Sequence, residues 1–166
     1  MKKLISLVLV LALSLCSVAA LAESTPSVRP FVIYQNEVTI NKVEDMDVDT
    51  LLFAVQQLAN VVSAPSLQDY FGDAAEGKDV DQFCPVKLQE AEGDVVLLFV
   101  RAEPFTAEEE VVVMIGVQNG NDVAWTACDD VVINDNGTLT VTVPADLAAA
   151  MLANPTVVAV LTKAAA

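Results

Sequence analysis

Few residues of this chain have the chemistry that catalysis requires. The 166 residues include no histidine, the side chain that most often serves as a general base and as a transition-metal ligand. A Ser-His-Asp or Cys-His nucleophile system therefore cannot be built within the chain. Any enzymatic chemistry would have to use carboxylates, a tyrosine or a lysine. No catalytic motif and no cofactor fingerprint is visible, so the sequence predicts a non-enzymatic protein without a cofactor.

The 23 acidic residues are the most abundant reactive groups. Two carboxylates flanking a glycosidic bond would serve a small extracellular hydrolase or another carbohydrate-active protein, and this stays an alternative. Residues 45–49 (DMDVD) alternate like an EF-hand calcium loop. Thr50 and Gln56, however, stand where that loop requires glycine and glutamate. An acidic turn that caps a helix is the favoured interpretation of this stretch.

Other acids fall at or next to expected turns, where loop carboxylates of extracellular proteins can bind calcium. A calcium-stabilised structural module is therefore a further alternative, although solvated turn acids are common. The weak candidates for metal ligands are Asp122, Asp129, Asp130 and Asp135.

Cys84 and Cys128 remain once the N-terminal segment is set aside. In an exported chain two cysteines favour a disulfide, and no Cys-Xaa-Xaa-Cys pair indicates an oxidoreductase. Trp125 lies three residues before Cys128. It is a possible ligand platform, but a tryptophan in a strand is more often packed in the core, here against the expected disulfide.

The N-terminal 22 residues are typical of a secretory signal peptide. Two lysines precede the apolar stretch Leu4–Leu15, and Ala20-Leu21-Ala22 fits the small-x-small cleavage pattern. We expect cleavage after Ala22, followed by a flexible lead-in over residues 23–30. Cys16 raises the alternative of a lipoprotein, which the large residue before it disfavours. The sequence thus predicts a secreted, extracellular protein.

The chain is strongly acidic, with a formal net charge of −15. Removing residues 1–22 removes two lysines and no acid, which leaves 6 basic and 23 acidic residues and a net charge of −17. Such a surface repels phosphate backbones and anionic lipid headgroups. Nucleic acids and anionic membranes are therefore not expected as partners.

These groups must be positioned by a fold that is mainly strands. The best helix candidate is residues 49–63, which Asp47 or Asp49 can cap and Pro65 ends. Its apolar residues repeat at spacings of three and four and predict one stripe that packs on the rest of the protein: Leu51, Leu52, Val55, Leu58, Ala59 and Val62. A short second helical turn is expected over residues 66–71.

Two apolar runs, residues 95–100 (VVLLFV) and 111–117 (VVVMIGV), have no polar alternation. We expect them to be neighbouring central strands covered on both faces, by an opposing sheet on one face and by the 49–63 helix or a partner on the other. A hairpin is expected over residues 31–40, and Pro85 demotes the strand at 83–88 to an edge or a bulge. Turns at 118–122 (QNGND) and 134–137 (NDNG) join further strands. Those strands are residues 123–128, 131–133, 138–143 and 156–161, with a short helix over residues 144–152 before the last.

About eight short strands with turn signals at regular spacing are typical of a sandwich or barrel. Residues 105–163 carry an FT-initiated strand, an NG turn, a tryptophan strand, a Gly-Thr hairpin and a PADL segment before the final strand. This half resembles small secreted proteins of anaerobic Gram-positive gut bacteria with an immunoglobulin-like sandwich. The resemblance implies the architecture and location but no activity.

We therefore expect one mainly β domain over residues 31–166, an immunoglobulin-like antiparallel β-sandwich with one or two packed helices; an α+β fold is the alternative. The expected function is an extracellular interaction module with a protein or cell-envelope partner, because secretion and a sandwich pattern coincide with a lack of catalytic groups.

Overall fold

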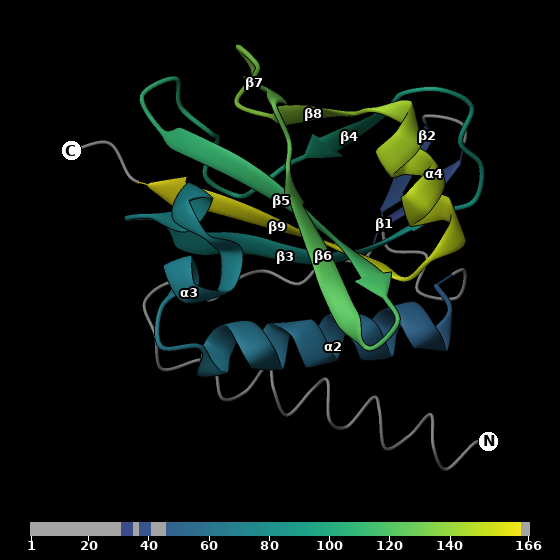
Figure 1. The fold of residues 1–166 in the computed structure, drawn as a ribbon. Coiled ribbons are helices and arrows are strands. Elements are labelled where there is room, and N and C mark those ends of the chain that lie inside the picture. Colours follow the sequence, from purple (N-terminus) through teal and green to yellow (C-terminus); the bar gives the residue numbers. More distant parts are fainter. Residues whose placement is uncertain (1–30, 35–36, 41–45, 164–166) are drawn as a thin grey trace.

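The computed structural model describes residues 31–34, 37–40 and 46–163, and side chains from residue 46 onward (Figure 1). The predicted signal peptide, the lead-in over residues 23–30, Cys16 and Asp45 lie outside the described residues. Within the described part, no helix is long and apolar enough to cross a membrane.

The described residues form nine strands, three α-helices and one 3-10 turn. The bounds are β1 Phe31–Tyr34, β2 Glu37–Ile40, α2 Val48–Ser63, α3 Leu67–Phe71, the 3-10 turn Asp73–Ala75, β3 Asp79–Leu88, β4 Val95–Phe99, β5 Glu110–Asn119, β6 Asp122–Ala127, β7 Asp130–Ile133, β8 Leu139–Val143, α4 Ala145–Ala153 and β9 Thr156–Lys163. The expected hairpin at 31–40 and both expected hairpin turns are confirmed.

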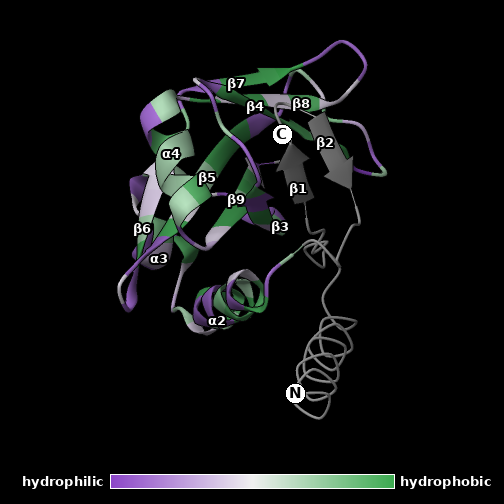
Figure 2. Cartoon of the chain, turned by 90° about the vertical axis from the view of Figure 1, so that its right-hand side faces the viewer, coloured by the Kyte–Doolittle hydropathy of each residue, from purple (hydrophilic) through white to green (hydrophobic). Residues whose placement is uncertain are grey.

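The strands form two sheets, of order β2-β1-β3-β9-β5-β6 and β4-β8-β7. In the large sheet β3, β9, β5 and β6 are antiparallel neighbours, whereas β1 runs parallel to β3. Figures 1 and 2 show three layers, with the small sheet on one face of the large sheet and α2 across the other. The prediction of a mainly β fold with two antiparallel sheets and packed helices is thus confirmed at this level.

Each face of the large sheet has its own apolar core. Between the sheets, β5 contributes Val113 and Ile115, and β8 contributes Leu139, Val141 and Val143, all fully buried. This is the inward face that the alternation of TLTVTV predicts. The second core lies between the large sheet and the helices, and contains Phe53, Val61, Phe71, Phe83, Met114 and Leu161. β9 is buried by both cores, so it is the strand at the centre of the molecule.

The turn Asn134–Gly137 also docks the long connector between β4 and β5. Gly137 has φ +75°, a conformation that favours glycine, and a Cβ there would lie 2.3 Å from the Cβ of Pro104. The amide of Phe105 donates to the carbonyl of Gly137 (2.9 Å). This glycine therefore serves the turn and the close approach of the connector at once.

The expectation that residues 95–100 and 111–117 form neighbouring central strands is wrong. β4 is an edge strand of the small sheet, and β5 lies in the large sheet. Of these two strands, only β5 is covered on both faces. β4 alternates between buried and exposed residues, with Val96 and Leu98 each 41 % exposed. The connector carries the chain from one sheet to the other, so the two runs face each other across the core.

The prediction of which helix residues pack on the sheet is also wrong, although the expected helix, residues 49–63, matches α2 to within one residue. α2 covers the large sheet as predicted, but its buried residues are Thr50, Phe53, Ala54, Gln57 and Val61. The six residues of the expected stripe lie at the sides of the helix or point away from the sheet. Polar Thr50 and Gln57 thus take core positions while Leu52 and Val62 remain exposed.

Pro85 lies inside the large sheet, in register with Val157 of β9. The pairing of β1 with β3 covers only Val86 and the two residues after it, so at Pro85 that side of β3 is not paired with β1. The missing amide of proline is tolerated where a strand lacks a partner. The predicted edge character therefore holds for one side of this residue and not for the whole strand.

Candidate functional site

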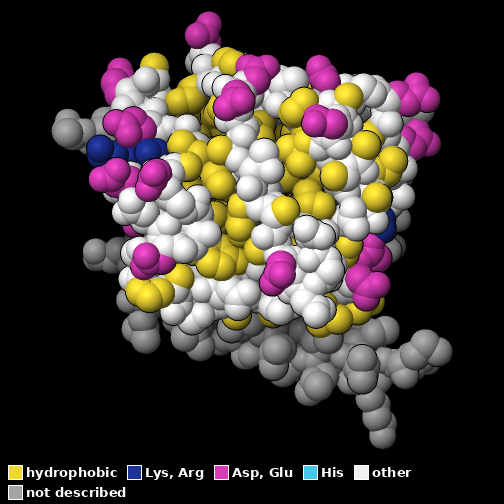
Figure 3. All heavy atoms as spheres, in the orientation of Figure 1, with side chains coloured by type: hydrophobic (Ala, Val, Ile, Leu, Met, Phe, Trp, Pro, Cys, Tyr) yellow, Lys and Arg dark blue, Asp and Glu magenta, His cyan; other side chains and the backbone are white. Residues whose placement is uncertain are grey.

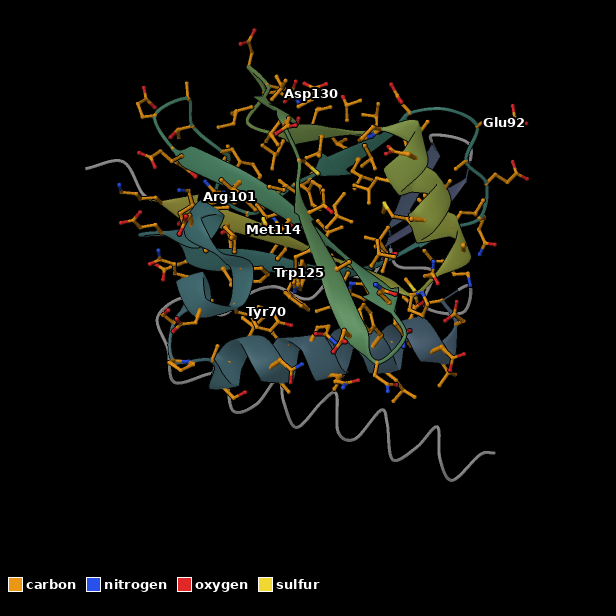
Figure 4. The ribbon with its side chains drawn as sticks, in the orientation of Figure 1. Tyr70, Glu92, Arg101, Met114, Trp125 and Asp130 are labelled. Carbon is orange, nitrogen blue, oxygen red and sulfur yellow. The ribbon has the colours of Figure 1, made fainter. Side chains whose placement is uncertain are left out.

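The acidic residues considered as calcium ligands lie apart. Asp122 begins β6 and Asp130 begins β7 after the chain has crossed between sheets, while Asp135 lies beyond the far end of β7. Asp129 adjoins Asp130 (labelled in Figure 4). Within the described residues no group of three or more histidine, cysteine, aspartate or glutamate side chains is placed to hold a metal ion.

Asp47, in the calcium-like stretch, caps the helix. Its Oδ1 accepts a hydrogen bond from the amide of Thr50 at the first turn of α2 (2.7 Å), as expected for an N-cap aspartate. Its Oδ2 forms an ion pair with Lys87 of β3. Burial raises the pKa of the Asp47 carboxyl, but the hydrogen bonds from Lys87 and Thr50 outweigh it and leave that pKa below its usual value. This stretch therefore fixes α2 on the large sheet.

The structure contains no disulfide between Cys84 and Cys128, contrary to the prediction. Cys84 lies on β3, and the amide of Cys128 bonds to Val113 on the far side of β5. In the order β3-β9-β5-β6 the two are three strand spacings apart, about 14 Å, and a disulfide needs Cα atoms within about 7 Å. Burial, and then the charge of Asp129, raises the pKa of the Cys128 thiol to about 11, so it is a weak nucleophile at neutral pH.

Trp125 packs into the core next to α2 and α3, on the opposite face of the sheet from both cysteines. Its ring meets the rings of Phe71, Tyr70 and Phe83 edge-on, at centroid distances of 4.7, 5.8 and 6.4 Å. Trp125 and Tyr70 are labelled in Figure 4. It also lies over its cross-strand partner Gly116. Packing, predicted as its commoner role, is confirmed, but its neighbours are aromatic rings rather than a disulfide.

The Tyr70 hydroxyl links this aromatic cluster to the polar residue buried under α2. It donates to Oε1 of Gln57 (2.6 Å), which also accepts from the Asn60 amide (3.3 Å). Burial raises the pKa of the Tyr70 phenol, and the nearby polar groups of Trp125 and Asn60 oppose part of the shift. The phenol therefore stays protonated and can donate to Gln57. The cluster is engaged in holding α2 and α3 against the sheet.

The strongest charge cluster surrounds Arg101, in the connector after β4. Its guanidinium forms ion pairs with Asp81 of β3 (3.4 Å) and with Glu109 before β5. It also stacks on Phe105, 4.0 Å from the ring centroid. All three charged side chains are mostly shielded from solvent. Both carboxylates are thus held in an ion-pair network that anchors the connector. The sequence analysis did not predict this network, although Arg101 is the only basic residue among the acids of residues 101–110.

An uncovered apolar surface lies on the outer face of the small sheet. Strand register aligns Leu98 of β4 with Thr140 of β8 and Val132 of β7, and the next row runs from Val96 through Thr142 to Asp130. We call these six residues the outer sheet face. Val96, Leu98 and Val132 are 41, 41 and 49 % exposed. No described element lies over this face, which is at the top of Figure 2.

Sequence reasoning missed the outer sheet face because residues 95–100 are apolar at every position. A half-exposed strand normally alternates with polar residues, and the absence of alternation predicted burial on both faces. The threonines of TLTVTV are the one signal that this sheet has an open side.

A view from the β6 edge shows further apolar side chains on both flanks of that strand, with acidic groups toward the margins (Figure 3).

Comparison with known proteins gives no relative for this chain: no protein-family model matches it, and neither the curated proteins nor the solved structures contain a significant match.

Proposed function

We propose that this protein is a secreted, non-enzymatic interaction module that binds a protein through the outer sheet face. The observation that carries the proposal is a set of half-exposed apolar side chains on the two outer strands of the small sheet, Val96 and Leu98 on β4 and Val132 on β7, on either side of the threonines of β8. Contiguous exposed apolar patches on soluble proteins mark interaction sites. A rigid sheet holds such a patch flat and preorganised, which lowers the entropy lost on binding.

Charge defines the chemistry of the partner. The chain has a net charge of −15, and Asp130 lies at the border of the outer sheet face. A partner with an apolar patch bordered by basic groups would gain both contact area and electrostatic attraction. We place this partner in the extracellular space or the cell envelope, because residues 1–22 have the pattern of a secretory signal peptide.

The alternatives of a carboxylate hydrolase and of a calcium-stabilised module gain no specific support. Asp81 and Glu109 are both paired with Arg101 rather than free to act on a sugar, and the turn acids are dispersed. A non-catalytic interaction role accounts for the exposed apolar face, which neither alternative requires.

We also propose an immunoglobulin-like architecture, supported by two packed antiparallel sheets built from β3 to β9. The support is limited to architecture, because the strand pairing differs. Lettering these seven strands A to G, an antibody constant domain pairs them as ABED and CFG. Here the orders are A-G-C-D and B-F-E. Any relationship to immunoglobulin-like secreted proteins therefore concerns a sandwich of different connectivity.

The test is partner capture by the secreted protein and by two charge-matched variants. Leu98→Asp with Val132→Asp places two acids in the outer sheet face; Thr126→Asp with Ala149→Asp places two acids at exposed positions on β6 and α4. Each is immobilised and exposed to the extracellular and envelope fractions of the producing organism. We expect a partner that wild type and the β6/α4 variant retain equally and the outer-face variant loses. No retained partner, or one that the outer-face variant retains equally, would contradict the proposal, provided that circular dichroism and melting show all three folded.

A further inference from the structure

Helix α2 has a second apolar face, opposite the one that packs on the sheet. It is formed by Val48, Leu52, Val55, Ala59 and Val62, which we call the outer seam. Val48, Leu52 and Val62 are 48, 44 and 76 % exposed. Ala59 is also exposed, and Val55 is half-buried.

The exposure of the outer seam is unfavourable for an isolated molecule. The same helix buries Thr50 and Gln57, each 3 % exposed, on its sheet-facing side, where Gln57 requires hydrogen bonds from its neighbours. A helix that is apolar on both faces is normally covered on both faces. The sequence of α2 thus fits a helix enclosed between the large sheet and a second body.

The spacing of the outer seam indicates that the second body is a helix. Its residues follow one another at intervals of four, three, four and three, the heptad spacing at which two α-helices pack side chains into each other's gaps. The seam extends through the whole length of α2, over four helical turns of about 3.6 residues each. A groove-binding loop or a strand would have no need of this repeat.

Charge selects the partner. Asp49 is the only charged residue in α2, in a chain with a net charge of −15. Two copies of this protein repel each other over most of their surfaces, whereas two outer seams can meet without bringing like charges together. No acid lies within the seam to attract a basic partner. We propose that the outer seam binds the outer seam of a second copy of this chain, and that the protein is a homodimer joined through α2.

An antiparallel pair fits the sizes of the seam residues. With Val55 on the two-fold axis, the seam residue of the partner nearest to Leu52 is Ala59, one residue from the level of Leu52, so a large side chain lies beside a small one at each of two symmetric positions. Val48 then faces the partner's Val62. This orientation also separates the two Asp49 carboxylates to opposite ends of the contact and aligns the helix dipoles favourably.

The dimer would orient two outer sheet faces away from the contact. α2 and the small sheet lie on opposite sides of the large sheet (Figure 2), so each copy presents its outer sheet face on the side remote from its partner. A partner with repeated sites would then be bound with avidity. The dimer itself does not depend on that partner and can be tested without it.

The first test is the mass of the purified, naturally processed protein in solution as a function of concentration, by sedimentation equilibrium. We expect the mass to rise from monomer to dimer. Leu52→Lys and, separately, Val62→Lys place a charge in the seam and should each weaken the dimer by about a hundredfold or more. Both sites are exposed, so the monomer should keep its melting temperature. Ala149→Lys adds the same charge on exposed α4 and should leave the dimer intact.

The second test locates the contact. Val55→Cys places a thiol on the expected axis, and mild oxidation should convert this variant to a covalent dimer. Ala149→Cys should form no covalent dimer under the same conditions, although its non-covalent dimer stays intact. The native Cys128 contributes little background because its thiol pKa is about 11. A wild-type protein that is monomeric at all concentrations overturns the proposal. So does a dimer that Leu52→Lys and Val62→Lys leave unchanged, or one that Val55→Cys does not cross-link.

Discussion

The contact between Gly116 and Trp125 predicts that Gly116→Ala destabilises the protein when the Trp125 ring is present and stabilises it when the ring is removed. A Cβ built on Gly116 would lie 2.7, 2.8 and 2.9 Å from three atoms of the Trp125 ring, closer than side-chain contacts allow. The ring is held by Tyr70, Phe71 and Phe83 and cannot move freely. We therefore expect Gly116→Ala to lower the free energy of unfolding by about 1–3 kcal/mol, the range for overpacking in a well-packed core.

With the ring removed, the same substitution should stabilise the protein. Trp125→Ala alone should lower the free energy of unfolding by about 3 kcal/mol, at the low end of the range for tryptophan because the ring is only half-buried. In that background Gly116→Ala should raise it by about 0.5–1 kcal/mol, because alanine loses less backbone entropy than glycine in a strand. The coupling between the two sites is then about 1.5–4 kcal/mol.

Urea denaturation of wild type, both single variants and the double variant measures this coupling as a double-mutant cycle. Gly116 and Trp125 are directly paired across β5 and β6, so an interaction is expected. Additive changes, within about 0.5 kcal/mol, would refute the argument that the ring occupies the space above Gly116. A Gly116→Ala protein as stable as wild type would refute it as well.

Three further predictions concern buried polar groups. Tyr70→Phe removes the hydroxyl that donates to Gln57 and should lower the free energy of unfolding by about 1 kcal/mol in urea denaturation; an unchanged free energy would contradict this contact. Arg101→Met leaves the shielded Glu109 carboxylate without its ion pair and should lower the free energy of unfolding by about 2 kcal/mol, a value between those for exposed and for buried ion pairs. Adding Glu109→Gln should recover part of this loss, and no recovery would contradict the assigned pairing. The Cys128 thiol of the native protein should react with iodoacetamide slowly at pH 9 and faster as the pH rises toward its pKa of about 11, because only the thiolate reacts; a rate already at its plateau at pH 9 would contradict its burial.

Local signals in the sequence predicted the individual elements well. The Asn-Gly turns, the N-cap at Asp47 and the stop at Pro65 act over a few residues, so their outcome depends little on the rest of the fold. The inward alternation of TLTVTV held for the same reason. The pairing of strands could not be predicted in this way, since β4 and β5 are both apolar and only the position of the connector decides whether they share a sheet.

The candidate sites failed where they required distant residues to meet. Cys84 and Cys128 are a plausible pair by composition, but the order of the large sheet separates them by three strand positions. For α2 the apolar residues extend over most of the helix circumference, so periodicity could not identify the buried side. Packing against the sheet selected Phe53 and Val61 and left the outer seam exposed. Both apolar surfaces proposed as contacts arise where the expectation of burial was wrong.

The affinity of wild type and of the Leu98→Asp, Val132→Asp variant for the captured partner is the most direct test of the central claim that the outer sheet face is a binding surface. Because a carboxylate in an apolar contact costs several kcal/mol, the account predicts a dissociation constant at least about a hundredfold higher for the variant. Equal dissociation constants for the two folded proteins would contradict it.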